Sequence, residues 1–160
     1  MKKLLIIALA LILSASAFGQ NKIKYGFTSG LELLGGDYLG GETGFNAGFI
    51  GELSFANNVY GNASLLYVNR DFFSDDNGAI VVPVHAGYKY QIADKVHLLG
   101  EAGPHLGFDF DYLDSHFMGG LGIKLGIEFS GKYRILLGED VTFFSGGRYN
   151  STIIGFAIFF

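Results

Sequence analysis

The feature that most constrains the fold of this chain is a strict alternation of two kinds of residue. Between Gly44 and Phe55, every second position is Phe, Ala, Gly or Leu, and the positions between them include Asn, Glu and Ser. The same period governs Phe117 to Phe129, where Leu, Ile and Phe alternate with Met, Gly, Lys and Glu. Successive side chains of a strand point to opposite faces, whereas a helix would mix the two sets on every face. The alternation therefore predicts β-strands with one apolar and one polar face.

Eight segments of the chain carry this period. The predicted strands are 23–34, 44–55, 59–73, 79–91, 95–112, 116–129, 132–144 and 151–160. Short connections at 56–58, 92–94 and 130–131 alternate with longer ones at 35–43, 74–78 and 145–150, although 113–115 is short for its place. An even strand number with short turns on one rim and longer loops on the other is typical of a transmembrane barrel.

Pro83 and Pro104 each remove a ladder hydrogen bond, so we expect a bulge or a strand end near each.

Aromatic residues indicate which solvent the apolar face meets. On an up-and-down path they gather at the two ends of that face, with aliphatic residues between them, as two membrane interfaces would select. One predicted band contains Tyr25, Phe55, Tyr88, Tyr90, Phe129, Tyr133 and Phe160, and the other contains Phe45, Tyr67, Phe108, Phe110, Phe117 and Phe143. Hydrocarbon offers no partner to backbone polar groups, so the strands must close. We predict an all-β, eight-stranded antiparallel up-and-down transmembrane β-barrel; a soluble lipocalin-like barrel is the alternative.

The first residues read as an export signal. Lys2 and Lys3 precede ten apolar residues and then a stretch of small and polar residues, which is the order of a secretory signal peptide. Ten residues are too few for a membrane-spanning helix, which needs about 20. We expect cleavage after Gly19, with Ala17 as the competing site. The predicted division is a signal peptide at 1–19 and a single barrel domain at 20–160.

Charge and cysteine content exclude several classes of function. The net charge is −4, and it becomes −6 when Lys2 and Lys3 leave with the signal. Such an acidic chain is not expected to bind nucleic acid. The absence of cysteine excludes disulfides, thiolate catalysis and cysteine-ligated metals. We predict no cofactor and no metal site.

The polar face of the strands would point into the barrel. It carries nearly balanced charge, and an eight-stranded barrel is just wide enough for its side chains to fill it. We therefore expect a packed, paired polar network, with a narrow water-filled pore as the alternative. Its predicted members are Lys24, Glu32, Glu52, Arg70, His85, Lys89, Glu101, His105, Asp109, Lys124, Glu128, Arg134 and Asp140.

Two groups of residues are candidates for chemical sites. Glu101, His105 and Asp109 are spaced by four and share one face of a strand, with His85 on the neighbouring strand. No suitable serine nucleophile accompanies them, so a hydrogen-bonded structural role is favoured and no catalytic residue is predicted. Asp71, Asp75 and Asp76 crowd one longer loop, where oxygen ligands can hold Ca²⁺ or bridge to lipopolysaccharide, although a solvated acidic loop is the simpler interpretation.

Several short motifs resemble a known family. The stretches 80–84, 87–90 and 101–107 and the terminal 158–160 are similar to those of small outer-membrane barrels of the OmpA/OmpX type, in detail the PorT-like group of Bacteroidota. The resemblance implies a location in the bacterial outer membrane, and we expect a monomer whose partners are outer-membrane lipid and lipopolysaccharide. It also implies insertion by the barrel-assembly machinery, which would read Phe160. It implies no single activity: we expect a non-enzymatic structural or surface-interaction role, with a small porin-like channel or a lipid-modifying barrel enzyme as alternatives.

Overall fold

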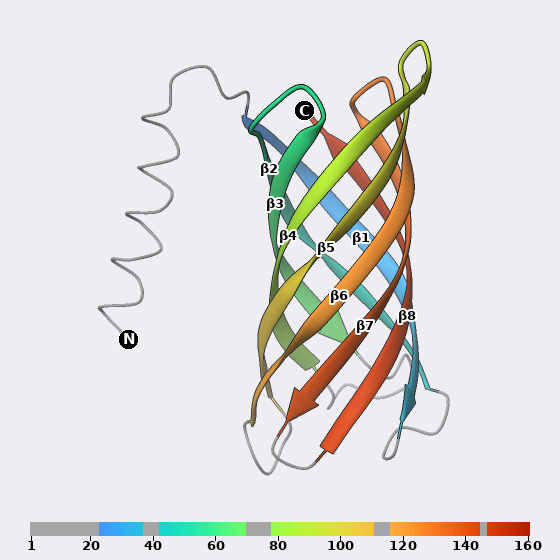
Figure 1. Ribbon diagram of the computed structural model, residues 1–160. Coiled ribbons are helices and arrows are strands. Elements are labelled where there is room, and N and C mark those ends of the chain that lie inside the picture. The colour runs from blue at the N-terminus through green and yellow to red at the C-terminus, as the bar shows by residue number, and fades with distance from the viewer. Residues whose placement is uncertain (1–22, 37–41, 70–77, 111–115, 145–146) are drawn as a thin grey trace, which may run out of the picture.

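A computed structural model describes residues 23–36, 42–69, 78–110, 116–144 and 147–160. They form eight strands, each paired antiparallel with its sequence neighbours, and β1 also pairs with β8, so the sheet closes into a barrel (Figure 1). The strands are β1 (Ile23–Gly36), β2 (Thr43–Ser54), β3 (Val59–Asn69), β4 (Gly78–Ala93), β5 (Val96–Asp109), β6 (His116–Phe129), β7 (Tyr133–Phe144) and β8 (Gly147–Phe159). The predicted closed eight-stranded antiparallel fold is confirmed.

Burial follows the period of the sequence. Along β3 the buried residues Tyr60, Asn62, Ser64, Leu66 and Val68 alternate with residues that are exposed or half-buried. Since the sheet is closed, the buried set points into the barrel and the other set points outward. The alternation that predicted the strands thus also separates the interior from the exterior.

The strands are staggered around the barrel. Opposite partners lead from Ser54 in β2 through Tyr60, Gly87 and the remaining strands, and they return to β2 at Gly44, ten residues away. Closing eight strands with this stagger requires them to tilt by about 40° from the barrel axis. The tilt is visible in Figure 1 as strands that cross the barrel obliquely.

Tight turns gather at one rim, which we call the turn rim, and we call the rim formed by the opposite strand ends the loop rim (Figure 1). Between β6 and β7, Ser130 and Gly131 both have positive φ values, and the Lys132 amide donates to the Phe129 carbonyl at 3.0 Å. Two central residues with positive φ match the twist of the flanking strands. Lys95, with φ 61°, closes the hairpin between β4 and β5.

Most strand limits lie within two residues of the sequence prediction, and the largest difference within the described residues is at the start of β8. β8 begins at Gly147, so 147–150, predicted as loop, belong to the strand. Arg148 and Asn150 are exposed there while Tyr149 is buried, so a polar outward face concealed the period. β1 continues to Gly36. The ends predicted for the third and fifth strands, 70–73 and 111–112, lie outside the described residues.

The expectation of a bulge or strand end at each proline is wrong. Pro83 lies inside β4 and Pro104 inside β5, and the partner numbering keeps one register on both sides of each proline. Ladder pairing is only interrupted beside them, between the pairs Ala63–Val84 and Leu66–Val81 and between Pro83–His105 and Ala86–Ala102. The long ladders on either side hold the strands in place across a few missing bonds. The register shift within the described strands falls instead between Gln91 and Ala93.

The turn at Gly131 yields a first prediction. Gly131→Ala places a Cβ at φ +68°, a backbone conformation that costs a residue with a side chain about 1 kcal/mol. We expect the free energy of unfolding, measured by urea titration in detergent micelles, to fall by about that amount. Gly51→Ala is the matched control, because an added Cβ there meets nothing within 4 Å. Equal stabilities for the two variants would contradict the turn assignment.

The barrel interior as candidate functional site

The inward face of the barrel contains most of the polar residues chosen from the sequence. Lys24, Asp109 and Asp140 are half-buried, and Arg70 lies outside the described residues. The remaining nine are buried: Glu32, Glu52, His85, Lys89, Glu101, His105, Lys124, Glu128 and Arg134. The structure separates them into a group near the turn rim, a central group and a group toward the loop rim.

A compact ion cluster occupies the interior near the turn rim. The Arg134 Nη2 atom donates to Glu52 Oε2 and to Glu128 Oε2, each at 2.5 Å. Lys89 Nζ donates to Glu52 Oε1 at 2.7 Å and to Glu128 Oε2 at 3.0 Å. Each carboxylate is thus shared by two cations. Because these four side chains come from β2, β4, β6 and β7, the cluster ties together strands that are distant in the sequence.

Aromatic rings and a further lysine complete this cluster. The Arg134 guanidinium carbon lies 4.7 Å from the centre of the Phe159 ring and 5.1 Å from that of Tyr60, and Lys89 Nζ lies 4.8 Å from the latter. Lys24 Nζ stands 3.8 Å from Glu52 Oε1 and donates to the Gly131 carbonyl at 3.2 Å. Such cation–π contacts strengthen when water is excluded. Charges and rings together fill the barrel at this level.

The central group is organised by Glu101. Its Oε2 accepts from the Tyr60 hydroxyl at 2.9 Å and from Asn62 Nδ2 at 2.7 Å. Its Oε1 lies 3.5 Å from His85 Nδ1. Tyr60 therefore belongs to both groups, because its ring packs against Arg134 while its hydroxyl contacts Glu101.

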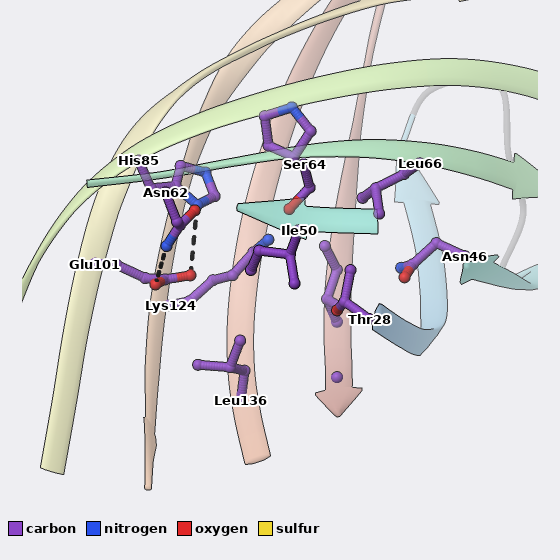
Figure 2. A pocket seen from close by; sticks show the side chains of 13 residues that line it. Thr28, Asn46, Ile50, Asn62, Ser64, Leu66, His85, Glu101, Lys124 and Leu136 are labelled. Atoms are coloured by element: carbon purple, nitrogen blue, oxygen red, sulfur yellow. Dashed lines mark hydrogen bonds and ion pairs between the residues drawn. The ribbon is translucent and has the colours of Figure 1, made fainter. Parts of the chain in front are cut away.

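Lys124 lies between two small cavities on the barrel axis. Each has a volume of about 30 Å³, and both are lined by Lys124, Leu66, Pro83 and Ile153. Figure 2 shows the Lys124 side chain extending past Glu101 toward Ile50. A cavity of this volume has room for one or two water molecules. Lys124 is also the register partner of Glu101 across β5 and β6.

The group toward the loop rim is held by separate hydrogen bonds. Asn46 Nδ2 donates to Glu32 Oε1 at 2.6 Å, and His105 Nε2 lies 2.9 Å from Thr142 Oγ1. Glycines of β6 make room for these side chains: a Cβ on Gly120 would lie 2.6 Å from His105 Nε2. Toward the same rim, Leu66, Val68, Ala79 and Met118 form a buried apolar cluster, so the interior is only partly polar.

Sequence reasoning selected the charged inward residues and passed over neutral ones. Tyr60 and Asn62, which hold Glu101, were not chosen, nor were Asn46 and Thr142. The signal was available, because each follows the inward alternation of its strand. Searching that face for every hydrogen-bonding side chain would have found them.

The residues considered from the sequence as a catalytic group make separate contacts. Ser64 lines the same cavity as His85 and Glu101, but among the described residues no hydrogen bond joins Ser64 to His85, as a nucleophile and its base require. Glu101 and His105 have separate partners, as described above. Across the described strands, no three His, Asp or Glu side chains are grouped so that they could hold a metal ion.

The outer surface is apolar between two aromatic bands. Of the residues chosen for these bands, all are exposed except Phe45, which is half-buried. Those of the first band lie near the turn rim and those of the second near the loop rim, where Phe45 packs on Tyr67 with ring centres 6.3 Å apart. Exposed aliphatic side chains such as Leu65, Leu125 and Leu137 lie between them.

These features define a class: a small closed β-barrel with an apolar exterior and an ion-paired interior. Comparison with solved structures finds the same fold. Neisserial surface protein A (NspA) aligns with a TM-score of 0.66 and 11% identity over 86% of this chain and 97% of its own. The N-terminal β-barrel domain of Pseudomonas aeruginosa OprF aligns with a TM-score of 0.55 and 11% identity over 88% of this chain and 100% of its own. No protein-family model and no curated protein sequence matches the chain.

The ion cluster leads to a second prediction. Arg134→Met leaves Glu52 and Glu128 buried with Lys89 as their main cation, and breaking a buried ion pair in this way costs about 3–5 kcal/mol. We expect the urea midpoint of the refolded protein to fall accordingly. Lys132→Met, in an exposed turn, is the matched control. If both variants unfold at the midpoint of the unchanged protein, the cluster does not stabilise the barrel.

Proposed function

We propose that this chain is an integral protein of the bacterial outer membrane with a structural or surface-interaction role and no enzymatic activity. The observation that carries the proposal is the distribution of polarity, which is the reverse of that in a soluble barrel. Charged side chains such as Arg134, Glu52 and Glu128 are buried inside, whereas thirty-one large hydrophobic side chains of the described residues are exposed outside. A monomeric soluble protein rarely exposes so extensive an apolar surface, and a lipid bilayer would cover it.

The dimensions of the outer surface support the same proposal. Ten residues separate Tyr133 from Phe143 along β7, and a strand rising about 3.3 Å per residue with a tilt of about 40° spans about 25 Å over that length. This equals the height of the apolar band of outer-membrane barrels, about 25 Å. The aromatic bands would then lie at the two membrane interfaces, with the loop rim outside the cell.

The narrower parts of the proposal rest on the sequence. The predicted signal at 1–19 would direct export, and Phe160 at the end of the last strand would be read by the barrel-assembly machinery. The same basis supports a monomer among outer-membrane lipid and lipopolysaccharide, and membership of the PorT-like group. Its short motifs, rather than its fold, are the argument for that group.

A third prediction tests insertion. We expect the protein, expressed with its N-terminal segment in a Gram-negative host, to fractionate with outer membranes. On gels it should migrate differently before and after boiling, because a closed barrel that is fully hydrogen-bonded resists detergent until heated. A soluble periplasmic protein without a mobility shift would contradict the proposal and favour the lipocalin-like alternative.

A small channel is the second candidate, and the two cavities around Lys124 favour it. Each is too small to form a continuous pore, and the Arg134 cluster fills the barrel between them and the turn rim. We therefore propose a closed interior.

As a fourth prediction, planar bilayers containing the protein should show no steady ion conductance above that of lipid alone. Regular single-channel steps that change size in Lys124→Met would establish the channel instead.

A further inference from the structure

One carboxylate lies on the apolar outer surface of the barrel. Glu139 of β7 is exposed, as are Leu137 two residues before it and Ile123, its partner across β6. Among the described strands, it is the one charged side chain that points outward between the two aromatic bands. Ionisable groups that face hydrocarbon are costly and are commonly functional.

Glu139 lies well inside the apolar band, on the turn-rim side of the edge that Phe143 marks. Phe143, which belongs to the aromatic band near the loop rim, lies four residues further along the same face of β7. With a rise of about 3.3 Å per residue and a tilt of about 40°, Glu139 is about 10 Å deeper along the barrel axis than Phe143. Water at the membrane surface does not reach that depth, so the carboxylate requires other partners.

Part of its hydrogen-bonding capacity is met by the neighbouring strand. Thr152 is the register partner of Glu139, and its Oγ1 donates to Glu139 Oε1 at 2.6 Å. Among the described residues, no further donor is within hydrogen-bond distance of the second oxygen, Oε2. The carboxylate therefore has an acceptor atom directed toward the surroundings of the barrel.

Thr152 begins a polar column that rises along β8 to the loop rim. Thr152, Asn150 and Arg148 are spaced by two, so they share the outward face, and Asn150 and Arg148 are exposed. Arg148 is the register partner of Phe143 and so lies level with the aromatic band near the loop rim. The column thus has a cation at the membrane surface and an anion at its deep end.

The polar column occupies β8 and reaches β7 only at Glu139. Leu31 and Leu33 of β1 are exposed on one side, and Leu121 and Ile123 of β6 are exposed on the other. A protein partner would cover about 800 Å² of the barrel surface, and the centre of such an interface is depleted in charged residues. A single lipid molecule is narrow enough to follow the column while its acyl chains contact the flanking leucines.

We propose that the column Arg148–Asn150–Thr152 with Glu139 binds a membrane lipid that has a phosphate headgroup and, beneath it, amide or hydroxyl donors. Arg148 contacts the phosphate, because guanidinium and phosphate form charge-assisted hydrogen bonds. Glu139 Oε2 accepts from the donors below. This site rests on the proposed membrane location, since only a lipid-embedded barrel presents this face to lipid.

The test compares three lipids by native mass spectrometry of the complete barrel released from detergent micelles. Ceramide phosphate carries the phosphate and the donors, phosphatidic acid carries the phosphate with ester linkages, and ceramide carries the donors alone. We expect ceramide phosphate to be retained about tenfold more than either of the others, the ratio given by one charge-assisted hydrogen bond.

Variants assign the preference to the column. Glu139→Leu should abolish the advantage of ceramide phosphate over phosphatidic acid, and Arg148→Gln should abolish its advantage over ceramide. Lys132→Gln, which removes a cation from an exposed turn at the opposite rim, is the matched control and should leave both preferences intact. Glu139→Leu replaces an exposed carboxylate by an apolar side chain, so the barrel should still fold.

Three results would overturn the proposal. Equal retention of the three lipids would show that the column does not select donors or phosphate. An unchanged preference in Glu139→Leu would place the site elsewhere. A dimer that Glu139→Leu dissociates would make this face an interface between copies. The boiled and unboiled mobility of each variant is measured in parallel, so a protein that shifts normally but selects no lipid contradicts this site and not the membrane location.

Discussion

Closure of the hydrogen-bond ladder between β1 and β8 is the constraint on which the rest of this structure depends. Without it, two strand edges would present unpaired amide and carbonyl groups to whatever surrounds the barrel, and hydrocarbon provides no partners for them. The eleven register pairs from Gly26–Phe159 to Gly36–Tyr149 remove both edges at once. Once the sheet is closed, the alternation within each strand has a geometric meaning, because one face must be enclosed and the other must be exposed.

The side chains of the enclosed face must pack within a narrow barrel. A cylinder of eight strands leaves room for side chains but little for bulk water, so charged groups inside must satisfy one another. The Arg134 Nη2 atom donates to two carboxylates, and its guanidinium lies against two aromatic rings. Toward the loop rim the interior changes character, with smaller hydrogen-bonded pairs, two cavities and an apolar cluster around Met118.

The sequence predicted the faces of the strands better than the contacts made across them. Alternation is local, so the inward direction of Glu52, Lys89 and Arg134 could be inferred from each strand alone. Which of these side chains meet depends on the stagger between distant strands, and no short stretch of sequence encodes it. The start of β8 was missed for a related reason: Arg148 and Asn150 point outward, and polar outward residues contradict the rule from which the strands were inferred. Glu139 was likewise not predicted as a site residue, because its hydrogen bond comes from Thr152 in the next strand.

The ion cluster also has a consequence for how the molecule reaches its final form. Its members lie on β2, β4, β6 and β7, so an incomplete sheet would hold Glu52 far from Arg134 and, in the proposed membrane location, would present uncompensated charges to lipid. Charge burial is then unfavourable at every stage before the last edge is sealed, and it becomes tolerable only in the finished cylinder. In the proposed membrane location, partly assembled barrels would be disfavoured in lipid for this reason, so insertion would be cooperative and the charges of the cluster would be neutralised only on completion.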